Sequence, residues 1–302
     1  MSEFTYVRAR SLDEAVALLN QPGLHSRVLA GGTDLVNQFR QGEAPCDRVV
    51  DVAHVPELRA IEDGDPIRIG AAVTHAEIAA SALLRARAPR LVQACRQIGS
   101  PQIRNVATLG GNVVNAAACA DSLPVLVCLE ARAVVVSAWG VERVPVAEFV
   151  TGVYQTQLPP GGLVQAFEFE APPPGSRCSF QRIGRRQAMS IARLSVAALG
   201  AVDGENRVSL LRLVPGAAFA RFRRAASVEE LLLGQEPTAG RIAGAGREMT
   251  RLFLQESGRR WSAPYKERAI AALTERALYE VVGQIGNLPN GSPGERHEGV
   301  SP

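Results

Sequence analysis

The more specific of two glycine motifs in the chain is Ile98-Gly-Ser-Pro-Gln-Ile-Arg-Asn-Val-Ala-Thr-Leu-Gly-Gly-Asn112, in which two adjacent glycines precede Asn112. The Asn112 side chain can donate and accept hydrogen bonds, and the Asp121 carboxylate, nine residues further on, can accept one from a ribose or a ring N–H. Asp121 also precedes an apolar run with helical character, so it is equally suited to be the N-cap of a helix. The two roles are compatible, and both stay open from sequence alone.

A second pair of glycines lies about 80 residues earlier, in Val28-Leu-Ala-Gly-Gly-Thr-Asp-Leu35. A strand is expected before this pair and a helix after it. Glycines let backbone N–H groups approach a phosphate without an intervening Cβ, and a helix start adds free N–H groups and a positive dipole end. Thr33 can add a hydroxyl donor. The pattern fits a phosphate-binding loop. A strand-Gly-Gly-helix segment is, however, more often an ordinary turn between two secondary-structure elements.

Two such segments fit a dinucleotide held between two lobes, and they do not fit a Rossmann site. The nearest match to the Rossmann pattern, Gly244-Ala-Gly246, lacks both a preceding strand and a third glycine. The chain also lacks the G-x-x-x-x-G-K-[ST] pattern of a P-loop.

Composition excludes several other classes of protein. The chain has 302 residues, enough for two domains, and a net charge of +3, which is too small for a nucleic-acid binder. Its five cysteines include no C-x-x-C pair, so no zinc or iron–sulfur motif is visible, and reduced thiols suit the cytosol. The N-terminus does not resemble a signal peptide, and no apolar run is long enough to cross a membrane.

Periodicity predicts a mixed α and β chain with a boundary near the Pro/Gly cluster at residues 171–175. Strands are expected at residues 26–29, 48–52, 67–69, 132–137, 163–170, 179–183, 195–202 and 207–214, with Asp203-Gly204 as a hairpin turn. Helices are expected at residues 11–20, 34–41, 87–98, 123–129, 227–233 and 264–282, with capping boxes at Ser11 and Thr74. A loop is expected from Thr108 to Asn112.

The two glycine motifs also resemble a known family. Residues 29–35 are similar to the first FAD motif of the molybdenum hydroxylase flavoproteins, the family of the xanthine dehydrogenase and carbon monoxide dehydrogenase FAD subunits, and residues 98–112 are similar to the second. Phe180-Gln-Arg-Ile-Gly-Arg-Arg186 resembles the start of the family's C-terminal domain, and Tyr265-Lys-Glu-Arg268 resembles part of its last helix. The likeness covers about residues 4–283.

The resemblance implies an α+β fold. It comprises a two-lobed FAD-binding domain of the p-cresol methylhydroxylase type at residues 1–173, with lobes at about 1–55 and 56–173. A C-terminal α/β domain with a three-stranded antiparallel sheet would follow at residues 176–285. Composition, not the resemblance, predicts a disordered tail at residues 286–302, which are rich in Gly, Pro and Asn and have little to bury.

The resemblance also implies which residues hold FAD. The two glycine segments would grip the diphosphate and nearby groups, Asp121 would hold the ribose or the adenine side, and Ile98 would contact a ring. Val164 and Gln181 or Arg182 match further contact positions, and Arg182 stands near a position where relatives commonly have lysine. The full set of expected contacts is Val28, Leu29, Ala30, Gly31, Gly32, Thr33, Asp34, Leu35, Ile98, Thr108, Gly110, Gly111, Asn112, Asp121, Val164, Gln181 and Arg182.

The implied function is that of a cytoplasmic oxidoreductase subunit. A molybdenum cofactor on a large partner subunit would oxidise the substrate, and 2Fe-2S clusters on a small partner subunit would reduce FAD on this chain. NAD+ or another acceptor would then take the electrons. No metal and no catalytic acid or base is expected here, and His25, His54 and His75 are expected at the surface or in caps. The alternatives are a stand-alone flavin reductase and a flavin-free scaffold or assembly protein.

Overall fold

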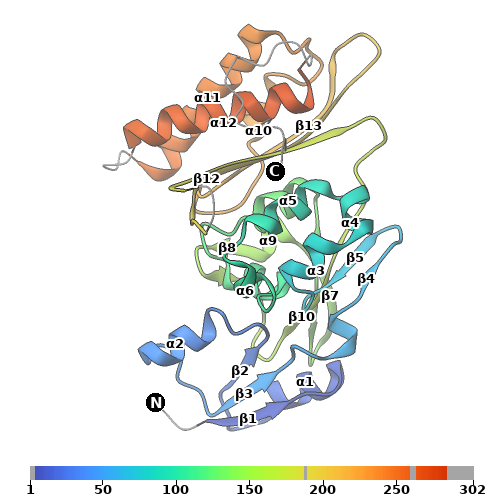
Figure 1. Ribbon diagram of the computed structural model, residues 1–302, viewed down its shortest axis with the longest axis vertical. Helices are drawn as coiled ribbons and strands as arrows, with labels where there is room; N and C mark the ends of the chain where they lie inside the picture. The colour runs from blue at the N-terminus through green and yellow to red at the C-terminus, as the bar shows by residue number, and fades with distance from the viewer. Residues whose placement is uncertain (1–3, 187–188, 259–262, 284–302) are drawn as a thin grey trace, which may run out of the picture.

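The computed structural model describes residues 4–186, 189–258 and 263–283. It rises in three tiers, with the N-terminal lobe at one end, a five-stranded sheet in the middle and the C-terminal sheet and helices at the other end (Figure 1). The predicted mixed α and β fold is confirmed. The tail predicted at residues 286–302 lies outside the described residues.

The first tier is a small parallel sheet in the order β1-β3-β2, carrying the first glycine segment at the end of its edge strand. Val50 and Ala15 are buried in its small core. The Ser11 hydroxyl caps the first helix by accepting a hydrogen bond from the Glu14 N–H. The elements are β1 (Thr5–Arg8), α1 (Leu12–Leu19), β2 (Ser26–Leu29), α2 (Leu35–Gln41) and β3 (Arg48–Asp51).

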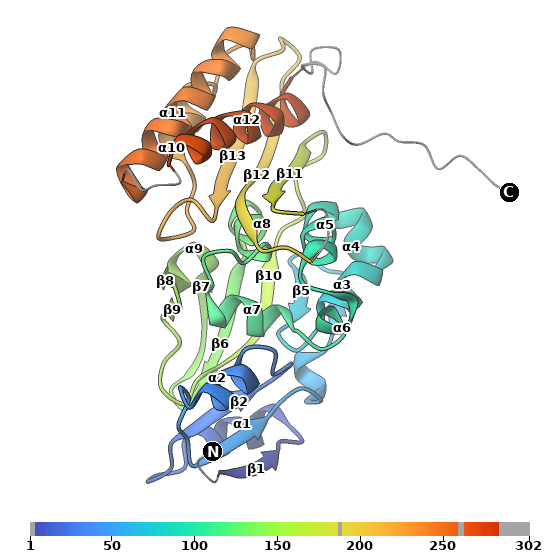
Figure 2. The same cartoon turned by 60° about the vertical axis from the view of Figure 1, so that its left-hand side comes forward.

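The second tier is an antiparallel sheet in the order β4-β5-β10-β6-β7, with short helices packed beside it (Figure 2). Its strands are β4 (Ile61–Glu62), β5 (Ile67–Gly70), β6 (Arg132–Ser137), β7 (Gly140–Pro145) and β10 (Leu163–Phe169), with the pair β8 (Val150–Gly152) and β9 (Gln155–Thr156) beside them. Its helices are η1 (Pro56–Leu58), α3 (His75–Ala80), α4 (Ala82–Arg87), α5 (Pro89–Gln97), α6 (Pro101–Arg104), α7 (Leu109–Asn115), α8 (Ser122–Cys128) and α9 (Val146–Phe149).

The helix expected at residues 87–98 is present as α5, which begins at Pro89 because proline suits the first position of a helix. Helix α4, which ends at Arg87, has no counterpart among the sequence predictions. One expectation for this tier needs correction. The loop expected at Thr108–Asn112 is the first turn of α7, because the Thr108 hydroxyl accepts a hydrogen bond from the Gly111 N–H and caps the helix. The capping box at Thr74 and Glu77 is confirmed.

The third tier is the predicted three-stranded antiparallel sheet, in the order β11-β12-β13, with two long helices over one face (Figures 1 and 2). The Asp203 carboxylate accepts hydrogen bonds from the N–H groups of Glu205 and Arg207, which closes the predicted hairpin. The elements are β11 (Arg177–Gly184), β12 (Ala192–Val202), β13 (Val208–Gly216), α10 (Ala226–Glu230), α11 (Ala239–Ser257) and α12 (Ala263–Val281).

Helix α11 has no counterpart among the sequence predictions, because three glycines lower its intrinsic helix propensity. Tertiary packing explains its presence. A Cβ on Gly246 would lie 2.6 Å from the Glu275 carboxylate and 3.3 Å from the Ala271 carbonyl oxygen, so this glycine lets α11 approach α12 closely. In the described part of the chain, no helix is long and apolar enough to span a membrane.

A buried carboxylate supports the third tier. Glu229 accepts hydrogen bonds from the Leu213 N–H at 2.7 Å and from the Arg224 guanidinium, which also pairs with Glu130 of the second tier at 2.9 Å. Glu229→Ala would leave the buried Leu213 N–H unpaired and would remove one of the two carboxylate partners of Arg224, and it should lower the free energy of unfolding by about 2–3 kcal/mol. Urea denaturation measures this, with exposed Glu230→Ala as the matched control. Equal midpoints for the two variants would contradict the prediction.

Candidate functional site

A cavity of about 570 Å³ lies between the first and second tiers, within the size range of small-molecule and cofactor sites. Its wall combines residues from β2 and the loop after it, from the start of α7 and from β10. The structure brings together here these residues of the predicted set: Val28, Ala30, Gly31, Gly32, Thr33, Asp34, Leu35, Ile98, Thr108, Gly110, Gly111, Asn112 and Val164.

The first glycine segment has the features of an anion cradle. Gly32 has φ +69°, a left-handed conformation that favours glycine. A Cβ on Gly31 would lie 2.0 Å from the Val106 carbonyl oxygen, so only glycine lets this loop contact the second motif. No group in the described part of the chain accepts a hydrogen bond from the N–H groups of Gly31, Gly32 or Thr33. These donors are therefore available to a ligand.

The second glycine segment works differently. The N–H groups of Leu109 and Gly110 donate to the carbonyl oxygens of Val73 and Ala71, at 3.0 and 2.8 Å. A Cβ on Gly110 would lie 2.6 Å from the Ala71 Cβ, so this glycine allows close packing. The backbone N–H groups of this motif thus hold the first turn of α7 in place. The motif contributes side chains, such as that of Asn112, to the cavity wall.

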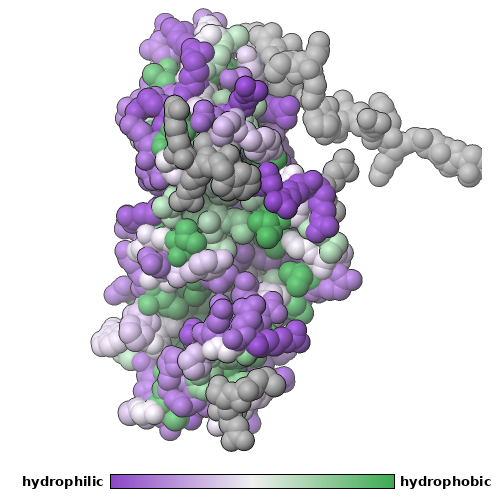
Figure 3. All heavy atoms as spheres, turned by 90° about the vertical axis from the view of Figure 1, so that its left-hand side faces the viewer, coloured by the Kyte–Doolittle hydropathy of each residue, from purple (hydrophilic) through white to green (hydrophobic). Residues whose placement is uncertain are grey.

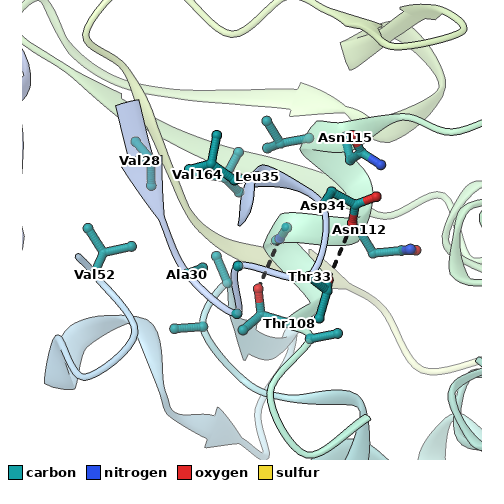
Figure 4. A pocket seen from close by; sticks show the side chains of 18 of the residues that line it. Val28, Ala30, Thr33, Asp34, Leu35, Val52, Thr108, Asn112, Asn115 and Val164 are labelled. Atoms are coloured by element: carbon teal, nitrogen blue, oxygen red, sulfur yellow. Dashed lines mark hydrogen bonds between the residues drawn. The ribbon is translucent and has the colours of Figure 1, made fainter. Parts of the chain in front are cut away.

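The cavity has a polar side and an apolar side (Figure 4). Asp34, Asn112 and Asn115 carry their polar atoms on one side, and Val28 and Val164 lie on the other. The Asn112 Oδ1 accepts a hydrogen bond from the Ser122 hydroxyl at 2.6 Å. In this arrangement the Asn112 NH₂ group remains a donor.

Sequence reasoning missed several lining residues, among them Arg27, Gln38, Asn115 and Tyr154. Asn115 could have been found, since it lies three residues after Asn112 and so shares its helix face. Tyr154 could not, because only the fold brings it here. Its backbone has φ +58°, and its N–H donates to the Ala116 carbonyl at the end of α7.

His75 corrects the expectation that the histidines are surface or capping groups. It is fully buried and lines the cavity. Its Nδ1 lies 3.4 Å from the Cys95 Sγ, and its Nε2 has no hydrogen-bond partner. Burial, with a smaller contribution from the Arg104 charge, lowers the pKa of His75 to about 4, so the ring is neutral at physiological pH.

Four residues of the predicted set do not line this cavity: Leu29, Asp121, Gln181 and Arg182. The Asp121 side chain makes no N-cap hydrogen bond. Instead it accepts one from the Arg182 Nε at 2.9 Å, which joins the start of α8 to β11. Burial raises the pKa of Asp121 to about 6, against the lowering effect of Arg182. Gln181 donates to the Glu280 carboxylate at 2.7 Å.

The fold and the cavity define a protein that can bind a dinucleotide between two lobes. Comparisons with known proteins agree with this. Residues 2–171 match the family model of the FAD binding domain in molybdopterin dehydrogenase, and residues 179–281 match that of the CO dehydrogenase flavoprotein C-terminal domain.

Individual relatives match along almost the whole chain. The xanthine dehydrogenase FAD-binding subunit of Escherichia coli O157:H7 is 31% identical, over 93% of this chain and 97% of its own. The glyceraldehyde dehydrogenase medium chain of Sulfolobus acidocaldarius is 29% identical, over 92% and 98%. A chain of carbon monoxide dehydrogenase from Hydrogenophaga pseudoflava superposes with a TM-score of 0.86 at 27% identity, covering 93% of this chain and 97% of that one. The protein therefore belongs to the family of FAD-binding medium subunits of the molybdenum hydroxylases, which are oxidoreductases.

Proposed function

We propose that this chain binds FAD in the cavity between its first two tiers and passes electrons from partner subunits to an acceptor. The observation that carries the proposal is the loop at Gly31–Thr33, which offers unpaired N–H groups and tolerates no Cβ at Gly31. Such a loop before a helix suits an anionic diphosphate. The Asn112 NH₂ group would add a donor, and the Asp34 carboxylate would accept from a sugar hydroxyl.

Bound FAD would supply the exchange between electron pairs and single electrons that the chain's own side chains cannot perform. The protein's part is to bind, orient and shield the cofactor. The apolar residues Val28 and Val164 would cover its ring or adenine surfaces. Asp121, Gln181 and Arg182 lie outside the cavity, and we propose that they act at the boundary with the C-terminal tier rather than on the diphosphate.

The partners we propose are a large subunit with a molybdenum cofactor and a small subunit with 2Fe-2S clusters, all in the cytoplasm. Exposed apolar side chains support a partner surface. Ile191 is 74% exposed and Met189 is 57% exposed, both just before β12, and Trp139 is 75% exposed at the β6–β7 turn. Apolar residues also gather across the middle of one face of the molecule (Figure 3). Exposed patches of this kind often mark interaction sites.

The electron acceptor can be identified on the FAD-loaded chain. The bound FAD is first reduced chemically in the absence of oxygen, and NAD+ is then added. Return of the flavin absorbance with formation of NADH identifies NAD+ as the acceptor. If the flavin absorbance returns only after a dye or oxygen is added, the acceptor is not NAD+. A chain that its small 2Fe-2S partner does not reduce, although it holds FAD, would contradict the proposed electron route.

Asn112→Asp tests the polar side of the cavity. The Ser122 hydroxyl can still donate to the new carboxylate, so the fold should be retained, but a donor becomes a negative charge near the proposed diphosphate. We expect FAD to bind about ten- to a hundredfold more weakly, the cost of one lost charge-assisted hydrogen bond. Fluorescence titration with FAD measures this. Ser122→Ala, which keeps the Asn112 NH₂ group, is the control and should retain most of the affinity. Equal affinity of Asn112→Asp and the wild type would place the diphosphate elsewhere.

A further inference from the structure

We infer that the backbone N–H and C=O groups of Val28, at the open edge of β2, recognise the adenine base of bound FAD through its N1 and its N6 amino group. The inference rests on the proposed function and names the part of the cofactor that this end of the cavity selects. Its starting point is the place of β2 at the edge of the first-tier sheet, where β3 is its one strand neighbour in the described chain. An edge strand keeps one row of backbone groups available to a ligand.

The hydrogen bonds of the sheet show which backbone groups of β2 are left over. The Leu29 carbonyl oxygen accepts a hydrogen bond from the Val52 N–H, just after β3, at 2.8 Å. The His25 carbonyl oxygen likewise accepts one from the Arg48 N–H at 3.3 Å. Because the direction of these groups alternates along a strand, Val28 turns its N–H and C=O away from β3. Among the residues that the structure describes, neither group has a hydrogen-bond partner.

The open edge of β2 faces the cavity. Arg27 and Val28 both line it, although consecutive side chains of a strand point to opposite faces of the sheet. What two such neighbours share is the backbone at the edge of the strand. The four residues of β3, all of them described, contribute nothing to the cavity wall, so the edge concerned is the one away from β3. A ligand in this part of the cavity therefore meets the Val28 N–H and C=O groups.

The end of the cavity beside Val28 is enclosed. Its wall includes the buried side chains of Val52, Leu58 and Ala72, which belong to the small core of the first tier. Val28 itself packs against that core. An apolar, enclosed end with one backbone donor and one backbone acceptor suits a flat heteroaromatic base.

The other end of the cavity is open. Figure 4 shows Asn115 on the side away from Val28. The next residue, Ala116, accepts a hydrogen bond at its carbonyl oxygen from the N–H of Tyr154, a cavity-lining residue that is 68% exposed. The flavin ring has to exchange electrons with groups outside this chain, so it belongs at the open end. The adenine takes no part in electron transfer, which leaves it the enclosed end.

Adenine presents the complement of the two Val28 groups. On its Watson–Crick edge the N6 amino group is a donor and N1, beside it, is an acceptor. The Val28 C=O can accept from the amino group while the Val28 N–H donates to N1. The first glycine loop begins three residues further on, at Gly31, at most about 11 Å away along the chain. An adenosine can span that distance, so the base and the diphosphate can be bound together.

The test compares the binding of FAD and of flavin hypoxanthine dinucleotide to the full chain by fluorescence titration. In the analogue an oxygen replaces the amino group and N1 carries a proton, so both Val28 groups would face the wrong partner. We expect the analogue to bind about ten- to a hundredfold more weakly than FAD. Equal affinities would overturn the inference and leave the proposed function in place. If neither dinucleotide binds, the proposed function fails first.

Val28→Pro removes the N–H from the open edge and keeps the ladder with β3, since proline is tolerated on an edge strand where the sheet does not use its nitrogen. FAD should bind about five- to fiftyfold more weakly, and the preference for FAD over the analogue should shrink. Val28→Ala is the matched control. It keeps both backbone groups, so its preference should equal that of the wild type. A preference that Val28→Ala loses and Val28→Pro keeps would assign the recognition to the side chain and contradict the inference.

Amide hydrogen exchange gives a readout that does not depend on affinity. The Val28 N–H should exchange rapidly in the apo protein and become protected when FAD saturates the site. The Leu29 N–H, which points to β3, should be protected in both states. A Val28 N–H that exchanges equally fast with and without bound FAD would overturn the inference.

Discussion

Gly31→Ala is expected to weaken FAD binding by about fivefold to a hundredfold, while most of the fold persists. The added Cβ would meet the Val106 carbonyl oxygen at 2.0 Å and its carbon at 2.7 Å, and both are backbone atoms that cannot rotate away. The first glycine loop must then move off the second motif, which shifts the unpaired N–H groups. Overpacking of this kind costs about 1–3 kcal/mol or more, and each 1.4 kcal/mol is a tenfold change in affinity.

The matched control is Gly240→Ala, the same change near the start of α11. A Cβ on Gly240 would meet nothing within 4 Å, so the variant should bind FAD normally and be stabilised slightly by better helix propensity. Fluorescence titration and thermal unfolding compare the two variants. If Gly31→Ala bound FAD as tightly as Gly240→Ala does, the contact between the two motifs would not be needed for the site.

Arg182→Leu should destabilise the protein by about 3–5 kcal/mol at pH 8, since it leaves a buried carboxylate without its partner. The exposed fractions of the two side chains are only 9% for Arg182 and 5% for Asp121. This loss of unfolding free energy should be smaller below pH 6. Burial raises the pKa of Asp121 to about 6 in the folded wild type, and losing Arg182 raises it further, so at low pH the carboxyl is neutral in both proteins.

The sign of this pH dependence follows from linkage. A carboxyl whose folded pKa lies above its unfolded pKa adds stability at low pH, and this stability is lost as the pH rises through the folded pKa. In Arg182→Leu the pKa of Asp121 is raised further, so stability continues to fall at higher pH than in the wild type. The difference in unfolding free energy between the two proteins therefore grows above about pH 6. Urea denaturation at pH 5 and pH 8 measures the gap. Adding Asp121→Asn should restore much of the stability at pH 8, and exposed Arg185→Leu is the control. A gap that does not change with pH would mean that Asp121 is not the source of the penalty.

The elements that local pattern determines could be predicted from the sequence. The strands β11, β12 and β13 show strand-like patterning with a strong turn signal at Asp203-Gly204, and all three are present. The local arrangement of strand, glycines and helix in the first glycine segment fits a phosphate cradle but also an ordinary turn, and the observed geometry suits the cradle.

What could not be predicted depends on contacts between distant segments. The second glycine segment looks like the first in sequence, yet its N–H groups are used by Ala71 and Val73, which no local pattern indicates. His75 follows a capping threonine and so looked like a helix-end residue, whereas packing against Cys95 buries it at the cavity. Helix α11 has weak propensity, and it packs against α12 through a close approach at Gly246.

The central claim is that the cavity binds FAD, and the most direct test is the visible absorption of the purified chain, followed by heat release and identification of the cofactor. We expect a flavin spectrum with a maximum at about 450 nm and release of FAD in a ratio of about one per chain. A colourless chain that takes up added FAD would still support the site, with partner subunits needed to retain the cofactor. A colourless chain that fails to take up FAD, alone and with its partners, would contradict the account.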